Sequence, residues 1–227
     1  MSKETIIISL GGSIIVPEKI DIGFLKNFKE LILKYLKTKK FFIVTGGGKT
    51  ARIYQKAAAW IGPLIRDDSD WLGIYGTRIN AHLIRTIFRR WAYKRIITNP
   101  VKMKKDIKED IVVAAGWKPG WSTDYVAVRL AEKYKIKTIL NMTNVSYVYD
   151  KDPDKYPEAK PLKEISWNNF LKIVGTKWSP RKSAPFGPPA SKLAQKLKIK
   201  VTVLNGKNIK NLDNFLQGKK FKGTIIG

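Results

Sequence analysis

The chain has 227 residues, enough for one large domain or two small ones, and 44% of them are hydrophobic, which excludes a disordered chain. It contains no cysteine and only one histidine, His82, so disulfides and thiolate metal sites are excluded and a histidine metal site or catalytic triad is disfavoured. Lys and Arg number 44 against 18 Asp and Glu, and the net charge of +26 leaves two interpretations open: a polyanionic partner, or a solvated basic face that serves small anionic substrates.

Short apolar runs alternate with helix-like segments along the chain. The predicted strands are Thr5–Leu10, Phe41–Thr45, Ile111–Ala115, Thr138–Met142 and Val201–Leu204, with Thr224–Ile226 as a final edge strand. The predicted helices are Gly23–Leu36, Thr50–Trp60, Arg78–Tyr93, Tyr125–Tyr134 and Pro189–Leu197. Continuous apolar strands that alternate with helices are typical of parallel sheets buried on both faces. We therefore expect an α/β fold, a three-layer α/β/α sandwich with a mainly parallel central sheet.

Two irregular segments interrupt this pattern. Asp150–Pro161 has the composition of a turn-rich hinge, and Gly175–Pro189 that of a loop ending where proline can begin a helix. No repeat is visible, and no long linker divides the chain. The first residues lack the features of a signal peptide, and no apolar run approaches about 18 residues, so we expect no membrane segment and a cytoplasmic location.

Three glycine-bearing turns follow predicted strands. They are Ser9–Ser13 (SLGGS), Thr45–Arg52 (TGGGKTAR) and Ala114–Asp124 (AAGWKPGWSTD). Because ligands bind outside the carboxyl ends of strands in open α/β sheets, the three turns together predict a backbone-lined anion cradle. The simpler interpretation of any one of them is an ordinary tight turn, and none matches the phosphate-loop or dinucleotide fingerprint.

The basic residues are concentrated in two stretches without any acid, Trp71–Lys105 and Ile165–Leu212. The cluster Arg85–Arg95 within the first stretch has three interpretations: a solvated helix face, a subunit interface, or a groove for a polyanion. His82 is expected at the surface or in a subunit contact. Trp60, Trp71 and Trp91 lie on or beside predicted helices and are expected to pack against them.

Five motifs carry a family resemblance, in the family's order. They are SLGGS, VTGGGKTARIY, SDWLGIYGTRINA, AAGWKPGWSTDYVAVRLAE and TNVSYVYDKDPDKYPEAKPL. The set resembles the uridylate (UMP) kinases of the amino-acid kinase family, most closely the archaeal-type branch. The resemblance implies a single domain over residues 1–227, with an acceptor half to about residue 135 and an ATP half from about residue 136. It also implies transfer of the ATP γ-phosphoryl group to UMP with Mg²⁺, a place in pyrimidine nucleotide biosynthesis, and a homohexamer.

The resemblance further implies roles for individual residues. Those implied at the transferred phosphoryl group are Gly11, Gly12, Ser13, Asp124 and Lys192. Those implied to bind UMP are Gly46, Gly47, Arg52, Asp70, Trp117, Ser122 and Thr123. Those implied to bind the ATP base and ribose are Thr143, Asn144, Tyr149 and Asp152. No protein ligand for the metal is identified, so Mg²⁺ is expected to arrive on the ATP phosphates. Trp117 and Trp121 have two interpretations, stacking on uracil or forming a wall of the pocket.

Three positions depart from the family pattern. Ser146-Tyr147 replaces an Asp-Gly pair, Gly187-Pro188 replaces an Asp-Pro pair before Lys192, and Ser9 stands where many members have lysine. The loss of an acid near Lys192 keeps a second hypothesis open: a catalytically degenerate kinase fold that serves as a basic nucleic-acid-binding or structural module.

Overall fold

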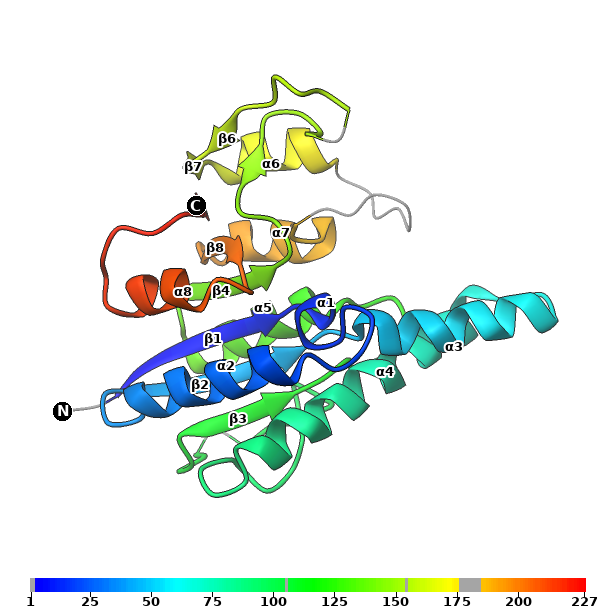
Figure 1. The fold of residues 1–227 in the computed structure, drawn as a ribbon, viewed down its shortest axis with the longest axis horizontal. Helices are drawn as coiled ribbons and strands as arrows, with labels where there is room; N and C mark the ends of the chain where they lie inside the picture. The colour runs from blue at the N-terminus through cyan, green and yellow to red at the C-terminus, as the bar shows by residue number, and fades with distance from the viewer. Residues whose placement is uncertain (1–2, 105, 154, 176–184) are drawn as a thin grey trace.

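A seven-stranded sheet forms the centre of the computed structural model, which describes residues 3–104, 106–153, 155–175 and 185–227 (Figure 1). In the order β3-β2-β1-β4-β8-β9-β7, its members are β3 (Ile111–Ala114), β2 (Lys39–Thr45), β1 (Glu4–Leu10), β4 (Thr138–Thr143), β8 (Lys200–Asn205), β9 (Thr224–Ile226) and β7 (Glu164–Ile165). The five strands from β3 to β8 are parallel, and β9 runs antiparallel to β8. A separate antiparallel pair consists of β5 (Val148–Tyr149) and β6 (Pro161–Leu162).

Helices cover both faces of the sheet (Figure 1). One face carries α1 (Gly12–Ile15), α2 (Ile22–Tyr35), α4 (Arg66–Ile87) and α8 (Ile209–Leu216). The other carries α5 (Thr123–Tyr134), α6 (Trp167–Val174) and α7 (Pro188–Lys196), while α3 (Gly48–Ile61) packs against α4. The predicted three-layer α/β/α sandwich is therefore confirmed. Among the helices in the described part of the chain, none is long and apolar enough to cross a membrane.

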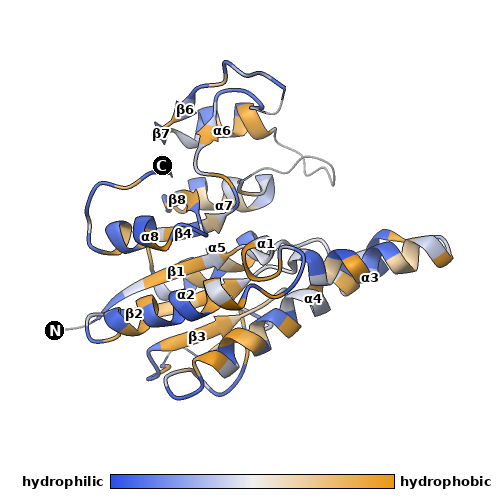
Figure 2. Ribbon diagram, in the orientation of Figure 1, coloured by the Kyte–Doolittle hydropathy of each residue, from blue (hydrophilic) through white to orange (hydrophobic). Residues whose placement is uncertain are grey.

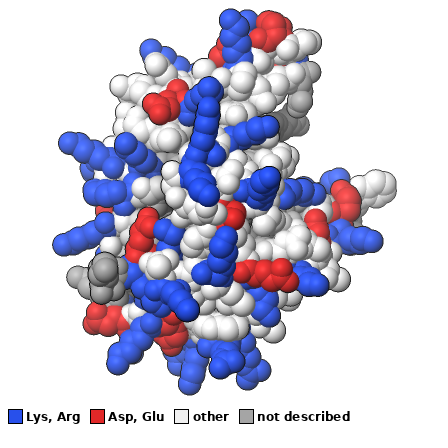
Figure 3. Space-filling model, turned by 60° about the vertical axis from the view of Figure 1, so that its left-hand side comes forward, with Lys and Arg blue, Asp and Glu red and all other residues white. Residues whose placement is uncertain are grey.

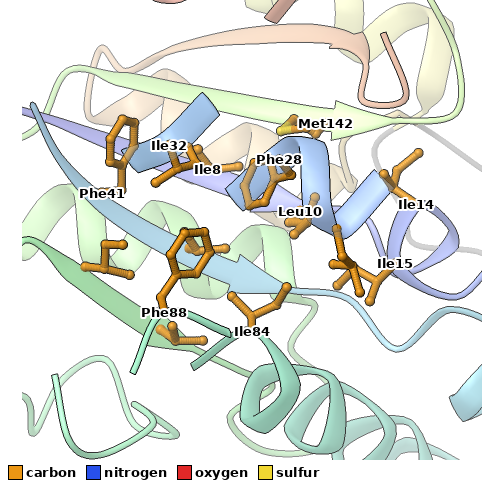
Figure 4. Close-up of a cluster of buried hydrophobic side chains, with 14 of the residues drawn as sticks. Ile8, Leu10, Ile14, Ile15, Phe28, Ile32, Phe41, Ile84, Phe88 and Met142 are labelled. Carbon is orange, nitrogen blue, oxygen red and sulfur yellow. The ribbon is translucent and has the colours of Figure 1, made fainter. Parts of the chain in front are cut away.

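The central strands bury side chains on both faces, which explains their continuous apolar sequences (Figure 2). Ile8 and Phe41 join the cluster under α2 and α4, whereas their neighbours Ile7 and Phe42 join the cluster under α5 and α7. The first of these clusters is shown in Figure 4, where Phe28 of α2 points toward the sheet. This alternation fixes the register of the strands, because a slip by one residue would exchange the two sets.

The predicted helix Arg78–Tyr93 is wrong at both ends. In the structure, α4 begins twelve residues earlier, at Arg66, with two acids in its first turn that favour the positive end of the helix dipole. It ends at Ile87, and the following residues run beside β3, where the Tyr93 N–H donates to the Ile111 carbonyl at 2.8 Å. Residues after Ile87 that have a helical sequence pattern therefore pair with the edge strand β3 instead.

Other predictions have mixed outcomes. The helices around α2, α3, α5 and α7 and the five parallel strands are confirmed to within a few residues, but α6 and α8 were not predicted. The final strand is not at an edge, because β9 lies between β8 and β7. Most of the predicted loop Gly175–Pro189 lies outside the described residues.

The predictions for single side chains on and near α4 also differ in outcome. His82 is exposed, as expected. Trp91 packs against the core, but the prediction for Trp60 is wrong, since 91% of its surface is exposed. Trp71 lies between these two cases, with 36% of its surface exposed and its ring tilted against Tyr75.

Candidate active site

The strand order brings the three glycine-bearing turns to one edge of the sheet. β3, β2, β1 and β4 are parallel neighbours, so their carboxyl ends lie side by side. Residues 11–13 follow β1, residues 46–48 follow β2, residues 115–124 follow β3, and Thr143 ends β4. Segments far apart in the sequence therefore line one edge, as the turn pattern predicts.

Two of these turns interlock main chain against main chain. A Cβ atom on Gly12 would lie 2.0 Å from the Gly48 nitrogen, and one on Gly48 would lie 2.1 Å from the Gly12 oxygen. A Cβ atom on Gly46 would lie 2.4 Å from the Gly12 nitrogen. Gly48 also has φ +59°, which disfavours any other residue. Contacts this short leave no room for side chains, so the surface at this point is bare backbone.

Asn80 of α4 holds the second turn in place. Its side-chain amide donates to the carbonyls of Gly46 at 2.8 Å and Gly47 at 3.0 Å, and it is almost fully buried. Because α3 begins at Gly48, its first N–H groups have no acceptor within the helix and lie beside this turn. The clamp therefore orients a helix N-terminus that favours an anion. The sequence analysis missed Asn80; its signal was a polar residue on the apolar face of a helix.

A cavity of about 340 Å³ lies beside the interlocked turns. Four of the residues implied to bind the acceptor line it: Gly47, Asp70, Ser122 and Thr123. Arg66, Lys118, Trp121 and Pro189 also line it, and the two basic side chains make its mouth favourable for an anion. The cavity combines backbone, basic groups and one aromatic wall, which suits a small phosphorylated molecule.

Three other residues implied to bind the acceptor do not line this cavity. Gly46 lies next to it, clamped by Asn80. Trp117 stacks against Trp121 with ring centroids 6.3 Å apart, so Trp121 rather than Trp117 is the lining tryptophan. Arg52 is exposed on α3, one turn beyond Gly48.

Glu18 is the carboxylate paired with Lys49, one turn before Arg52. A hydrogen bond from Lys49 and its charge hold the pKa of Glu18 below its usual value, with a smaller contribution from Arg52. Glu18 forms its ion pair with Lys49, and Arg52 is not among the residues that line the cavity.

Asp70 is already engaged by the third glycine-bearing turn. One of its carboxylate oxygens accepts a hydrogen bond from the Gly120 N–H at 2.8 Å, and Gly120 has φ +82°. This contact joins α4 to the segment between β3 and α5 and shapes the cavity wall between them.

Asp124 connects three elements at the centre of the edge. One carboxylate oxygen accepts from the Ser9 hydroxyl at 3.0 Å, and the other accepts from the Gly187 N–H at 3.2 Å. Burial raises the pKa of Asp124, and the two hydrogen bonds act in the opposite direction. The carboxyl group therefore ties β1 to α5 and to the start of α7. Two of the family departures, Ser9 and Gly187, are its partners.

The residues implied to bind ATP fall into two groups. Thr143 and Asn144 lie beside the first turn, because the Gly11 N–H donates to the Met142 carbonyl at 2.9 Å. Tyr149 belongs to β5 and Asp152 to the turn that follows it, in the small second sheet. Lys192 is exposed on α7, one turn after Gly187. The sheet edge thus brings the first pair to the site, and the second pair stands on a separate hairpin.

The described residues contain no cluster of three His, Asp or Glu side chains that could hold a metal ion by themselves. Asp124 is the one carboxylate identified at the centre of the edge, and both of its oxygens already accept hydrogen bonds. These residues fit a metal that is carried mainly by ligand phosphates better than one held by a protein cage.

Comparisons with known proteins agree with this architecture. Residues 4–205 match the model of the amino acid kinase family. The chain is 36% identical to a uridylate kinase of Thermoplasma volcanium, covering 98% of this chain and 97% of that protein. It is 34% identical to a uridylate kinase of Pyrococcus abyssi, with 97% and 98% covered. The crystal structure of uridylate kinase from Archaeoglobus fulgidus superposes with a TM-score of 0.83 at 30% identity, covering 98% and 99%.

The buried Asp124 has a testable effect on stability. Since burial raises its pKa above the ordinary 3.8, the folded protein holds this proton more tightly than the unfolded chain. The stability from protonated Asp124 is therefore greatest in acid and is lost as pH rises through the folded pKa. Asp124→Asn keeps an acceptor oxygen without the charge, so we expect its stability relative to the wild type to increase as pH is raised from about 4, up to the folded pKa of Asp124, within a series extended to about pH 8.

Urea denaturation across that pH range measures this difference directly. The exposed Asp68→Asn, which removes the same charge from α4, is the matched control and should show no comparable trend. A difference between Asp124→Asn and wild type that stays constant with pH would show that burial does not govern this carboxyl group.

Proposed function

This chain belongs to the amino acid kinase family, and we propose that it is a UMP kinase of the archaeal type, which transfers the γ-phosphoryl group of ATP to UMP to give UDP. The observation that carries the proposal is the pair of interlocked glycine turns beside a basic cavity, in a chain similar over nearly its whole length to uridylate kinases. UDP formation is a step of pyrimidine nucleotide synthesis, and we propose a cytoplasmic location for it.

For phosphoryl transfer the protein mainly has to hold the acceptor phosphate in line with the ATP γ-phosphate and to stabilise charge on the transferred group. The bare backbone of Gly11, Gly12 and Ser13 would contact the ATP phosphates and the transferred phosphoryl group. Gly46 and Gly47 would hold the UMP phosphate at the N-terminus of α3. The acceptor is itself a phosphate oxygen, so no catalytic base is required.

The rest of the acceptor site follows from the cavity lining. Asp70 would receive the ribose, and Ser122 and Thr123 would frame the nucleotide at the start of α5. Arg52, exposed one turn into α3, would reach the UMP phosphate, where its guanidinium can donate two hydrogen bonds. We assign the wall facing uracil to Trp121 in place of Trp117, because Trp121 lines the cavity.

The ATP half would begin at about residue 136, within one kinase domain over residues 1–227. Thr143, Asn144, Tyr149 and Asp152 would bind the base and ribose, and Lys192 would lie near the phosphates. Mg²⁺, when bound with ATP, neutralises phosphate charge. Asp124 would keep β1, α5 and α7 in register around the transferred group.

The departure at Gly187 does not by itself indicate a lost active site. Its N–H donates to Asp124, and a Cβ atom there would be 3.9 Å from an Asp124 oxygen. A second carboxylate at this position would stand beside a buried one, and like charges repel strongly there. The backbone N–H of residue 187 is available to Asp124 with any residue except proline, but glycine avoids a second carboxylate there, so we favour an active kinase over the degenerate alternative.

We also propose that the protein forms a homo-oligomer, with a hexamer as the expected size. Figure 1 shows α3 and the start of α4 extending beyond the sheet. The pair of helices α3 and α4 exposes large apolar side chains. Trp60 is 91% and Ile61 90% exposed, and more than half of the surface is exposed at Tyr54, Ile65, Tyr75 and Ile79. So many apolar groups on one projection indicate a buried contact, which must overcome the repulsion of +26 charges per subunit.

The kinase proposal is tested by a coupled ADP-release assay with ATP, Mg²⁺ and UMP, beside CMP and AMP. We expect turnover selective for UMP. Arg52→Ala should lower kcat/KM about 10- to 100-fold, the value of a charge-assisted bidentate contact. Lys56→Ala removes a charge one turn further along α3 and is the matched control, with a change of less than about twofold. Folded protein without turnover, or equal turnover of all three nucleotides, would refute the assignment.

The oligomer proposal is tested by light scattering coupled to gel filtration. Trp60→Glu combined with Ile61→Lys leaves the net charge unchanged and should reduce the mass of the assembly, because two charged groups would have to be buried. Tyr156→Ser, at an exposed aromatic residue between β5 and β6 and away from α3 and α4, is the control and should leave the mass unchanged. A wild-type protein that elutes as a monomer would exclude the oligomer.

A further inference from the structure

A second large cavity lies at the opposite end of the sheet from β3. It has a volume of about 870 Å³ and is formed by α8, the α8–β9 connection, β9 and the start of β7. It shares no lining residue with the acceptor cavity. Tyr147, one of the departures from the family pattern, lines it. We call it the α8 groove.

The α8 groove is strongly basic. Five lysines line it against a single acid, Glu164, and they are Lys163, Lys210, Lys219, Lys220 and Lys222. All five are exposed, and within the described part of the chain none of them has an ion-pair partner. Figure 3 shows Lys and Arg side chains crowding the face of the molecule that includes this end. Unpaired like charges held together cost free energy unless an anion binds them.

The basic surface continues past the groove. A further cavity of about 590 Å³ shares Gly218 with it and is lined by Lys39, Lys135 and Lys137, with Lys39 paired to the lining acid Glu4. Gly218 ends the turn after α8 with φ +69°, and a Cβ atom there would meet nothing within 4 Å. The two cavities therefore lie side by side at the end of α8. A single small anion would need only one of them, whereas an anionic chain can follow both.

The lining also contains groups that recognise bases. Tyr147 and Phe221 are half-buried, and the ring of Phe221 is supported edge-on by Phe215 with centroids 5.2 Å apart. Asn208 and Asn214 add side-chain amides to the same groove. A basic groove that follows the phosphates, with aromatic rings on which bases stack, is the arrangement of proteins that bind single strands.

We propose that the α8 groove and the cavity beside it at Gly218 bind single-stranded nucleic acid. The lysines contact consecutive phosphates, and Tyr147 and Phe221 stack on unpaired bases. The strand lies outside the acceptor cavity, so its binding is separate from that of UMP, although Tyr147 stands between Asn144 and Tyr149 in the stretch proposed to bind ATP. A nucleic-acid partner also accounts for the net charge of +26, which the binding of a mononucleotide does not require.

The test is fluorescence anisotropy with a labelled RNA of about 20 nucleotides that lacks uridine, which avoids occupation of the acceptor cavity. The groove variant replaces Lys163, Lys219, Lys220 and Lys222 with Gln. The matched control replaces Arg89, Arg90, Lys94 and Arg95 with Gln; it removes the same charge from the other exposed basic cluster. Thermal unfolding and the kinase assay verify that both variants remain folded.

At about 100 mM salt we expect the groove variant to bind at least about tenfold more weakly than wild type, and the control variant less than about threefold. The slope of log affinity against log salt should fall in magnitude by about 3 in the groove variant, since each lost phosphate contact removes about 0.7. Equal losses in the two variants, or no binding by wild type at low salt, would overturn the proposal.

A competition experiment decides between a polynucleotide and any other polyanion. Unlabelled single-stranded RNA should displace the probe at lower charge concentration than inorganic polyphosphate or duplex RNA, because only unpaired bases can stack on Tyr147 and Phe221. Displacement by all three competitors at the same charge concentration would overturn the assignment to single strands.

Discussion

The close approach of two glycine turns is the constraint on which the candidate site depends. Gly12 and Gly48 come so near that a side chain on either would overlap the backbone of the other. This contact brings the residues that follow β1 against the start of α3 and leaves no room for side chains between them. Asn80 holds the same turn from α4, so the geometry does not depend on the ligand alone. A surface of fixed dipoles loses little reorganisation energy when phosphate binds.

The second constraint is the way in which Asp124 is buried. Its partners, the Ser9 hydroxyl and the Gly187 N–H, are neutral donors, and its neighbourhood raises its pKa. The two departures from the family pattern are therefore consistent with each other, because they surround one carboxyl group. Judged separately in the sequence, they look like losses; judged together in the structure, they form one hydrogen-bonded set.

The sequence predicts the alternating strands, helices and glycine turns, but not the features that depend on contacts between distant residues. Continuous apolar strands and glycine turns predict the parallel sheet and its ligand-binding edge. The start of α4 was missed because Gly73 and Gly76 disfavour helix, yet a Cβ atom on Gly76 would lie 2.8 Å from the Ala51 Cα, so glycine allows α3 and α4 to touch. The polar Asn80 on an apolar helix face is a signal in the sequence, but its partners are not, because they are main-chain carbonyls more than thirty residues away.

The contact between Gly12 and Gly48 sets the backbone of Gly46 and Gly47 in the position where we propose that it holds the acceptor phosphate. The most direct measurement is calorimetric binding of UMP and of uridine to wild type, Gly48→Ala and Gly62→Ala. Gly62 has open space around it and serves as the control. We expect wild type and Gly62→Ala to bind UMP more tightly than uridine, and Gly48→Ala, if folded, to lose that preference. An unchanged preference for UMP in Gly48→Ala would contradict the account.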